Sequence, residues 1–187
     1  TMAIVYDENG KPLENEFVDR AGNGIINDKD WYFYKKPTAD VLMGLTSKLI
    51  YKNWDFNFSL RASFNNYVYN DVEAGNSNCK STVVYSFEAL NNRPKMVLAN
   101  NFQGVGNFYM SDYYVQNASF LKCDNITLGY SFDKIFGKEI SGRVFGTVQN
   151  VFTITDYKGL DPEINGGIDN SIYPRPLTSI VGLSLNF

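Results

Sequence analysis

The feature that most restricts the fold of this 187-residue chain is a long run of alternating apolar and polar residues. Between Trp54 and Phe64 every second residue is apolar, and the intervening positions carry Asp55, Asn57, Ser59, Arg61, Ser63 and then Asn65. Successive side chains of a β-strand point to opposite faces, so this run predicts one strand with an apolar face and a polar face. An ordinary strand has about five or six residues. This one is expected to be far longer.

The preceding residues continue the pattern across a tight turn at Lys52 and Asn53. The apolar face of that earlier strand is formed by Val41, Met43, Leu45, Leu49 and Tyr51. Tyr51 and Trp54 flank the turn, where an aromatic girdle of a membrane barrel would lie. We therefore expect residues 40–70 to form a hairpin in a barrel wall.

A second hairpin is predicted over residues 118–155. Its alternation places Arg143, Thr147 and Gln149 on the polar face, while Phe145 falls on the same face without an explanation in the sequence. Leu121 and Cys123 are out of phase with the later apolar residues Ile126, Leu128, Tyr130 and Phe132. A β-bulge near Asp124 would restore the phase, because a bulge adds one residue to one strand of a pair.

Residues 176–187 predict a terminal strand, with apolar groups at Val181, Leu183, Leu185 and Phe187. Such a strand faces either a protein core or lipid with its apolar side. The spacing of Gly182, Leu185 and Phe187 resembles the carboxyl-terminal assembly signal of bacterial outer-membrane barrels. These three residues are therefore candidates for that signal.

The remaining segments are expected to be connections. Residues 1–37 form an irregular loop, residues 71–117 a long external loop, and residues 156–175 a loop rich in Gly and Pro. Outer-membrane barrels combine long external loops with short periplasmic turns, so such lengths agree with a barrel. A short helix is expected after Ser81, with Val83, Val84, Phe87 and Leu90 at helical spacing.

The segment from Asp19 to Asp30 resembles a twelve-residue calcium loop. Oxygen ligands at Asp19, Asn23, Asn27 and Asp30, with Gly24 at the sharp turn, have the spacing of such a loop. Ala21 brings no oxygen to the third position and Asn23 is neutral, so only two carboxylates would meet the cation. The alternative is an Asn- and Gly-rich turn without a metal. A structural calcium ion is the one cofactor candidate.

Composition excludes several functions. The chain has no His, so it holds no histidine-based catalysis or histidine metal ligands. Its net charge of -3 argues against nucleic-acid binding, which needs clustered basic residues. Asp161, Glu163 and Asp169 lie in one loop without the pattern of a catalytic pair, and no enzyme activity is expected. The two cysteines, Cys79 and Cys123, could form one disulfide, and the sequence does not decide whether they do.

Longer motifs resemble one family. The order Ser111–Tyr130, Gln149–Thr155, Tyr157–Glu163, Tyr173–Pro176 and Gly182–Phe187 is similar to the carboxyl-terminal end of SusC/RagA-type TonB-dependent outer-membrane transporters. The resemblance covers essentially the whole chain. It departs from the family at Ala21, Asn23 and Cys123.

The resemblance implies an all-β fold: the last strands of a large antiparallel barrel of 22 strands, with an amino-terminal plug mostly absent here. It implies an outer-membrane importer of glycans or peptides. The partners would be the rest of the barrel and plug, a SusD-like surface lipoprotein, the TonB complex through the missing amino-terminal region, and membrane lipid. Substrate contacts are unassigned. Two roles remain open for the aromatic residues of the long loop: their rings would either stack on sugars or pack the loop. These residues are Phe102, Phe108, Tyr109, Tyr113 and Tyr114.

Two other functions stay open. A soluble, secreted β-sandwich that binds carbohydrate would need its apolar strand faces to pack against each other. A non-transporting adhesin or porin wall would share the strands but lack a plug. A requirement for detergent would separate the barrel wall from the soluble sandwich. A plug in the sequence that precedes this chain would separate the importer from the adhesin or porin wall.

Overall fold

The computed structural model describes residues 1–76, 102, 110–133, 140–170 and 172–186. The chain divides into two compact units, which are described separately. The first unit comprises Thr1–Thr38, Tyr67–Asn117 and Lys158–Ile172, and the second comprises Ala39–Asn66, Ala118–Tyr157 and Tyr173–Phe187. Within the described residues, no helix is both long and apolar enough to cross a membrane.

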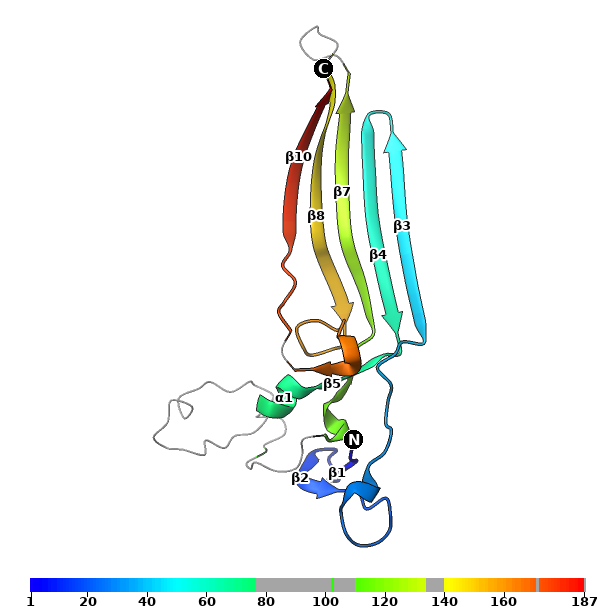
Figure 1. Ribbon diagram of the computed structural model, residues 1–187, viewed down its shortest axis with the longest axis vertical. Helices are drawn as coiled ribbons and strands as arrows, with labels where there is room; N and C mark the ends of the chain where they lie inside the picture. The colour runs from blue at the N-terminus through cyan, green and yellow to red at the C-terminus, as the bar shows by residue number, and fades with distance from the viewer. Residues whose placement is uncertain (77–101, 103–109, 134–139, 171, 187) are drawn as a thin grey trace, which may run out of the picture. The chain divides into compact units, whose positions relative to one another are not determined.

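The second unit is one antiparallel sheet of five strands. They are β3 (Val41–Tyr51), β4 (Trp54–Phe64), β7 (Phe120–Phe132), β8 (Ser141–Thr155) and β10 (Thr178–Asn186). Figure 1 shows these strands side by side in a single layer, in the order β10-β8-β7-β4-β3. The expected all-β, antiparallel fold is confirmed. The strands lie where the sequence alternates, because that alternation gives each strand two chemically different faces.

The register of the sheet sorts the side chains onto two faces. Trp54 lies opposite Tyr130, and Asp55 lies opposite Gly129. We call the face that carries Asp55 the inner face and the face that carries Trp54 the outer face. The charged residues of the five strands all belong to the inner face; they are Lys48, Asp55, Arg61, Lys122, Asp124 and Arg143.

The outer face is apolar, and among the described residues of this unit no second sheet packs on it. Many of its large apolar side chains remain exposed, as Val181 (83%) and Leu183 (63%) illustrate. A β-sandwich would cover such a face with another sheet. An uncharged apolar band along strands of 9 to 15 residues instead has the chemistry of a surface that lies in lipid.

A bulge at Asp124 keeps this separation intact. The pairing of β4 with β7 runs from Ser59–Asn125 to Leu60–Cys123, so Asp124 has no partner on β4. The extra residue places Cys123 on the outer face and allows the carboxylate of Asp124 to reach Arg61 on the inner face. The phase change expected near Asp124 is therefore present in the structure.

Phe145 lies on the inner face because a glycine beside it leaves room for its ring. Gly182 of β10 is the register partner of Phe145 on β8. A Cβ atom at Gly182 would stand 2.2 Å from Cζ of Phe145, so the ring occupies the space above this glycine. The guanidinium of Arg143 lies 4.9 Å from the centroid of the same ring. The aromatic residue that the alternation left unexplained thus covers a gap in the sheet.

The first unit contains short elements, most of them in segments that the sequence predicted as loops, whereas residues 67–70 were predicted as the end of the hairpin over residues 40–70 and belong to this unit instead. Residues 1–37 hold a two-stranded sheet and a 3-10 helix, and the later segments add a three-stranded sheet. The elements are β1 (Ile4–Tyr6), β2 (Pro12–Phe17), η1 (Asp28–Asp30), β5 (Tyr67–Asn70), α1 (Asp71–Asn76), η3 (Asp112–Tyr114), β6 (Val115–Asn117), η4 (Asn165–Gly167) and β9 (Ile168–Asp169). β5 pairs antiparallel with β6 and parallel with β9. Strands this short carry no readable periodicity. The helix expected after Ser81 falls outside the described residues.

Aromatic packing holds the first unit together. Its core consists of Ile4, Ala74, Phe102 and Tyr114, with Tyr69 and Tyr113 packed against it. The rings of Tyr113 and Tyr114 meet edge to face at 5.0 Å. For Phe102, Tyr113 and Tyr114, the structure therefore supports packing over sugar stacking. Phe108 and Tyr109 lie outside the described residues.

Replacing Gly182 with Val should displace the Phe145 ring and lower the free energy of unfolding by about 1–3 kcal/mol, the usual cost of overpacking. Gly44 provides the control, since a Cβ atom there would meet nothing within 4 Å. Chemical denaturation of the whole protein in detergent measures both variants. Gly182→Val combined with Phe145→Ala should recover part of the loss. Equal losses for Gly182→Val and Gly44→Val would contradict this packing.

Candidate functional site

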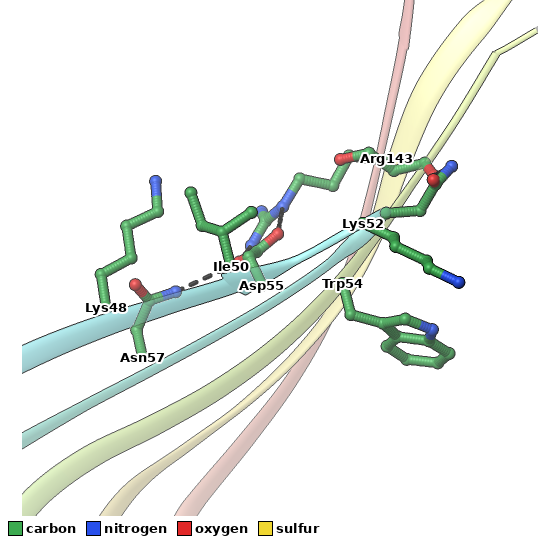
Figure 2. Close-up of a pocket in the computed structure, with 9 residues that line it drawn as sticks. Lys48, Ile50, Lys52, Trp54, Asp55, Asn57 and Arg143 are labelled. Atoms are coloured by element: carbon green, nitrogen blue, oxygen red, sulfur yellow. Dashed lines mark hydrogen bonds and ion pairs between the residues drawn. The ribbon is translucent and has the colours of Figure 1, made fainter.

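A bidentate ion pair marks the turn end of the inner face. Arg143 of β8 donates from Nε to Oδ1 of Asp55 at 2.8 Å and from Nη2 to Oδ2 at 2.6 Å. The Asp55 side chain is 12% exposed and that of Arg143 34%. Asn57 also donates to Oδ2 of Asp55 at 3.1 Å, as Figure 2 shows. Both carboxylate oxygens of Asp55 are thus engaged.

Gly129 makes this pair geometrically possible. Asp55 lies on β4 and Arg143 on β8, and β7 runs between these two strands. A Cβ atom at Gly129 of β7 would stand 2.4 Å from Nη2 of Arg143 and 2.5 Å from Oδ1 of Asp55. The missing side chain therefore lets the guanidinium cross an intervening strand.

A hollow of about 470 Å³ surrounds the ion pair. It is lined by Lys48, Ile50, Lys52, Asn53, Trp54, Asp55, Asn57, Ser131 and Arg143. Asn53 fixes the turn to β7, because its side chain donates to the Ser131 carbonyl at 2.8 Å and its own carbonyl accepts from Ser131 N–H at 2.8 Å. The lining carries three cationic groups and one carboxylate, so the hollow is electropositive.

A second ion pair lies farther along β4. Arg61 donates from Nε to Asp124 Oδ2 at 2.5 Å and from Nη2 to Oδ1 at 2.9 Å. The side chains of this pair are more exposed than those of the first pair, 42% for Arg61 and 27% for Asp124. Paired charges on the inner face and no charge on the outer face are what a wall between lipid and a polar interior requires.

Aromatic rings gather on the outer face beside the same turn. Trp54 packs against Tyr130 with ring centroids 4.8 Å apart, and Tyr51 is the register partner of Trp54. Trp and Tyr favour the membrane–water interface because each ring joins an apolar body to a polar tip. The turn end therefore has the chemistry of the interface, as the sequence predicted.

The Asp19–Asp30 segment is closed by hydrogen bonds from the backbone to its carboxylates. Asp19 accepts from the N–H groups of Gly22 and Gly24, both at 2.7 Å. Asp30, only 1% exposed, accepts from Arg20 at 2.9 Å, Ala21 at 3.0 Å and Asn27 at 2.8 Å. These bonds, with that of Ala21 the largest contributor, lower the pKa of Asp30 below its usual value.

The side-chain amides of Asn23 and Asn27, predicted as metal ligands, also accept hydrogen bonds from the loop backbone. Asn23 Oδ1 accepts from Ile25 at 2.9 Å, and Asn27 Oδ1 accepts from Lys29 at 2.9 Å. Asn27 is the N-cap of η1 and forms a capping box with Asp30. The four predicted ligands, Asp19, Asn23, Asn27 and Asp30, thus support the turn itself. A cation at this loop stays a prediction.

A tyrosine connects this loop to the rest of the first unit. Tyr32 donates to Asp112 Oδ2 at 2.7 Å, and Oδ1 of Asp112 accepts from Ile4 N–H at 3.1 Å. The guanidinium of Arg20 lies 4.3 Å from the centroid of the Tyr32 ring. Burial, together with the hydrogen bond to Asp112, raises the pKa of the Tyr32 hydroxyl. Tyr32 therefore stays protonated as a donor.

The other predicted residues are placed as follows. Leu185 lies on the outer face opposite Gly142, and Gly182 lies beneath Phe145, while Phe187 is outside the described residues. The assembly signal stays a prediction. Cys123 is a buried free thiol, and Cys79 is outside the described residues. Asp161 accepts from the Glu163 N–H at 2.9 Å, and Asp169 lies in β9.

No protein-family model matches the chain. Among curated proteins, it is 57% identical over 187 residues to the TonB-dependent receptor SusC of Bacteroides thetaiotaomicron, a match that covers 98% of the chain and 18% of SusC. It is 30% identical over 190 residues to the TonB-dependent receptor P3 of Formosa agariphila, covering 91% of the chain and 19% of P3. The chain thus spans less than a fifth of the length of these relatives.

Solved structures show the same fold. A chain of the RagAB peptide transporter superposes with a TM-score of 0.75 and 20% identity, over 100% of this chain and 22% of that one. A chain of the RagAB peptide importer in its closed-closed state superposes with a TM-score of 0.65 and 19% identity, over 98% of this chain and 20% of that one. At these identities the likeness concerns the fold alone.

The antiparallel sheet, its uncharged outer face and its paired inner charges define a section of a transmembrane β-barrel wall. The relatives then identify the barrel. The chain belongs to the SusC/RagA type of TonB-dependent receptor, and the expected location in the bacterial outer membrane is confirmed.

Removing either Asp55 or Arg143 should lower the free energy of unfolding by more than the lost packing of that side chain, because the charge of its partner is then left unpaired on a partly buried surface. A double-mutant cycle of Asp55→Ala and Arg143→Ala should give a coupling energy of about 1–2 kcal/mol. Unfolding of the intact receptor in detergent measures it. The more exposed Arg61–Asp124 pair is the control and should couple more weakly. Additive losses at Asp55 and Arg143 would contradict a functional pair.

Acid should open the Asp19–Asp30 loop. The pKa of Asp30 is lowered in the folded loop. The stability that its carboxylate gives the loop is therefore fully present above pH 3.8, the ordinary pKa, and is lost as the pH falls through the lower pKa of the folded state. Hydrogen exchange, corrected for its intrinsic pH dependence, should show lost protection at Arg20, Ala21 and Asn27. Asp30→Asn should reduce this protection at neutral pH and remove its acid dependence. Unchanged exchange in Asp30→Asn would contradict the closure.

Proposed function

We propose that this chain forms wall strands of an outer-membrane, TonB-dependent importer of nutrients, with glycans or oligopeptides as its substrates. One observation carries the proposal: 57% identity to the receptor SusC extends over 98% of the chain. Similarity of this extent spans both the sheet and the first unit. A structural neighbour is named a peptide transporter, which supports import as the activity and keeps peptides among the candidate substrates.

The wall would act as a scaffold, and it supplies no chemistry of its own in the proposed mechanism. Its outer face would lie in lipid, where every backbone donor and acceptor needs a partner inside the sheet. Its inner face would border the path of the solute. Residues 71–117 and 156–175, which connect strands at the ends opposite the short Lys52–Asn53 turn, would be external loops.

The partners of such an importer are part of the proposal. They are the remaining strands and the plug of the same protein, a SusD-like surface lipoprotein over the external loops, and the TonB complex in the periplasm. A structural calcium ion at Asp19, Asn23, Asn27 and Asp30 is a further candidate. Gly182, Leu185 and Phe187 would serve as the assembly signal. We propose no catalytic residue.

Growth and uptake test the proposed function. A strain that lacks the gene should lose growth on the imported nutrient, and plasmid-borne receptor should restore it. Defined glycan mixtures and peptide mixtures, each offered as the sole carbon source, identify the substrate class. Uptake should also stop when a protonophore collapses the proton gradient. Normal growth of the deletion strain on every nutrient, or uptake that ignores the protonophore, would contradict an energy-dependent importer.

A further inference from the structure

The hairpin turn between β3 and β4 places a lysine at the rim of the outer face. Lys52 belongs to the turn rather than to a strand, and its Nζ lies 5.4 Å from the centroid of the Tyr51 ring. Figure 2 shows the Lys52 side chain and the Trp54 indole projecting from the turn on the side away from Lys48. We call Tyr51, Lys52 and Trp54 the turn cluster. It joins one ammonium group to two aromatic rings at the end of the apolar outer face.

The polar groups of the turn cluster have no counter-charge. Among the described residues, neither ion pair of the sheet includes Lys52. In the same part of the chain, no group accepts a hydrogen bond from the Trp54 indole N–H or from the Tyr51 hydroxyl. Asp55, the residue after Trp54, holds both of its carboxylate oxygens to Arg143. The turn cluster therefore presents three donors to whatever lies beside it.

The backbone holds the turn cluster in one arrangement. Lys52 has a φ of 54°, the left-handed conformation that a two-residue hairpin turn requires. Asn53 is fixed to Ser131 of β7 by two hydrogen bonds of 2.8 Å. The Trp54 ring packs on Tyr130, with centroids 4.8 Å apart. Because these contacts restrict the turn and the indole before a ligand arrives, binding costs little conformational entropy.

We propose that Tyr51, Lys52 and Trp54 bind the phosphate group of a phospholipid in the periplasmic leaflet of the outer membrane. The short turns of outer-membrane barrels lie on the periplasmic side, at the level of the headgroups. A lysine near a lipid surface attracts anionic headgroups. The indole N–H and the tyrosine hydroxyl, on side chains that are 49% and 72% exposed, would donate to phosphate oxygens. The acyl chains would then follow the apolar outer face.

The position of the aromatic rings at an interface does not by itself require a phosphate. Trp and Tyr at that level favour any amphiphile, including one without charge. The ammonium group of Lys52 adds a preference for an anion, since no described carboxylate neutralises it. The apolar surface beside it favours an anion that carries acyl chains over a free ion. The inference goes beyond the proposed transport function and does not depend on the imported substrate.

Lipid retention by the intact receptor tests the site. The receptor is delipidated in detergent and titrated with phosphatidylglycerol, and native mass spectrometry counts the bound lipids. Lys52→Gln should weaken the occupancy of one lipid site about five-fold, the effect of one basic residue near a lipid surface. Lys52→Arg should retain the lipid. Lys29→Gln, at an exposed lysine of the first unit, is the matched control and should bind as the wild type does.

Two further measurements separate the phosphate from the other parts of the lipid. Trp54→Phe keeps an aromatic ring but removes the N–H donor, so it should also weaken phosphatidylglycerol binding. Diacylglycerol, which has the acyl chains without the phosphate, should bind the wild type and Lys52→Gln equally. Equal phosphatidylglycerol retention by the wild type and Lys52→Gln would overturn the proposal. Displacement of the lipid by millimolar inorganic phosphate would also overturn it, because the site would then bind a free ion.

Discussion

The structure of the sheet depends on the confinement of charge to one face. Lipid cannot accept an unpaired ion, so a wall that separates lipid from a polar interior must keep every charged side chain on the inner side. The six charged residues of the five strands meet this requirement, and four of them form two bidentate arginine–aspartate pairs. The bulge at Asp124 and the glycine at position 129 both contribute to this one arrangement.

The first unit follows a different principle. Its short strands and single described α-helix bury an aromatic core around Phe102 and Tyr114, and its turns are closed by Asp and Asn side chains that accept backbone hydrogen bonds. None of its described strands shows the long alternation of the sheet. This contrast separates a segment shaped by a lipid boundary from one shaped by its own small core.

The strands and the faces could be predicted because alternation is a local property of each segment. The phase change near Asp124 was also readable, since Leu121 and Cys123 disagree with Ile126. The contacts that define the site were not readable. Asp55 and Arg143 are 88 residues apart, and only the register of three strands brings them together across Gly129. Phe145 was noticed as an exception, but the glycine that explains it lies on another strand. The strands of the first unit were missed because two to six residues carry too little pattern.

The ion pair that passes over Gly129 has a mechanical consequence. Asp55 and Arg143 belong to β4 and β8, so the pair fastens two strands that share no backbone hydrogen bonds and holds β7 beneath it. A slip of one residue along β7 would turn its polar side chains toward lipid, and a slip of two residues would move a strand by about 7 Å. Either slip of β8 would pull the guanidinium away from the carboxylate. The pair therefore acts as a brace against shear, and it locks the alignment of three neighbouring strands at the end where the connecting turn is shortest.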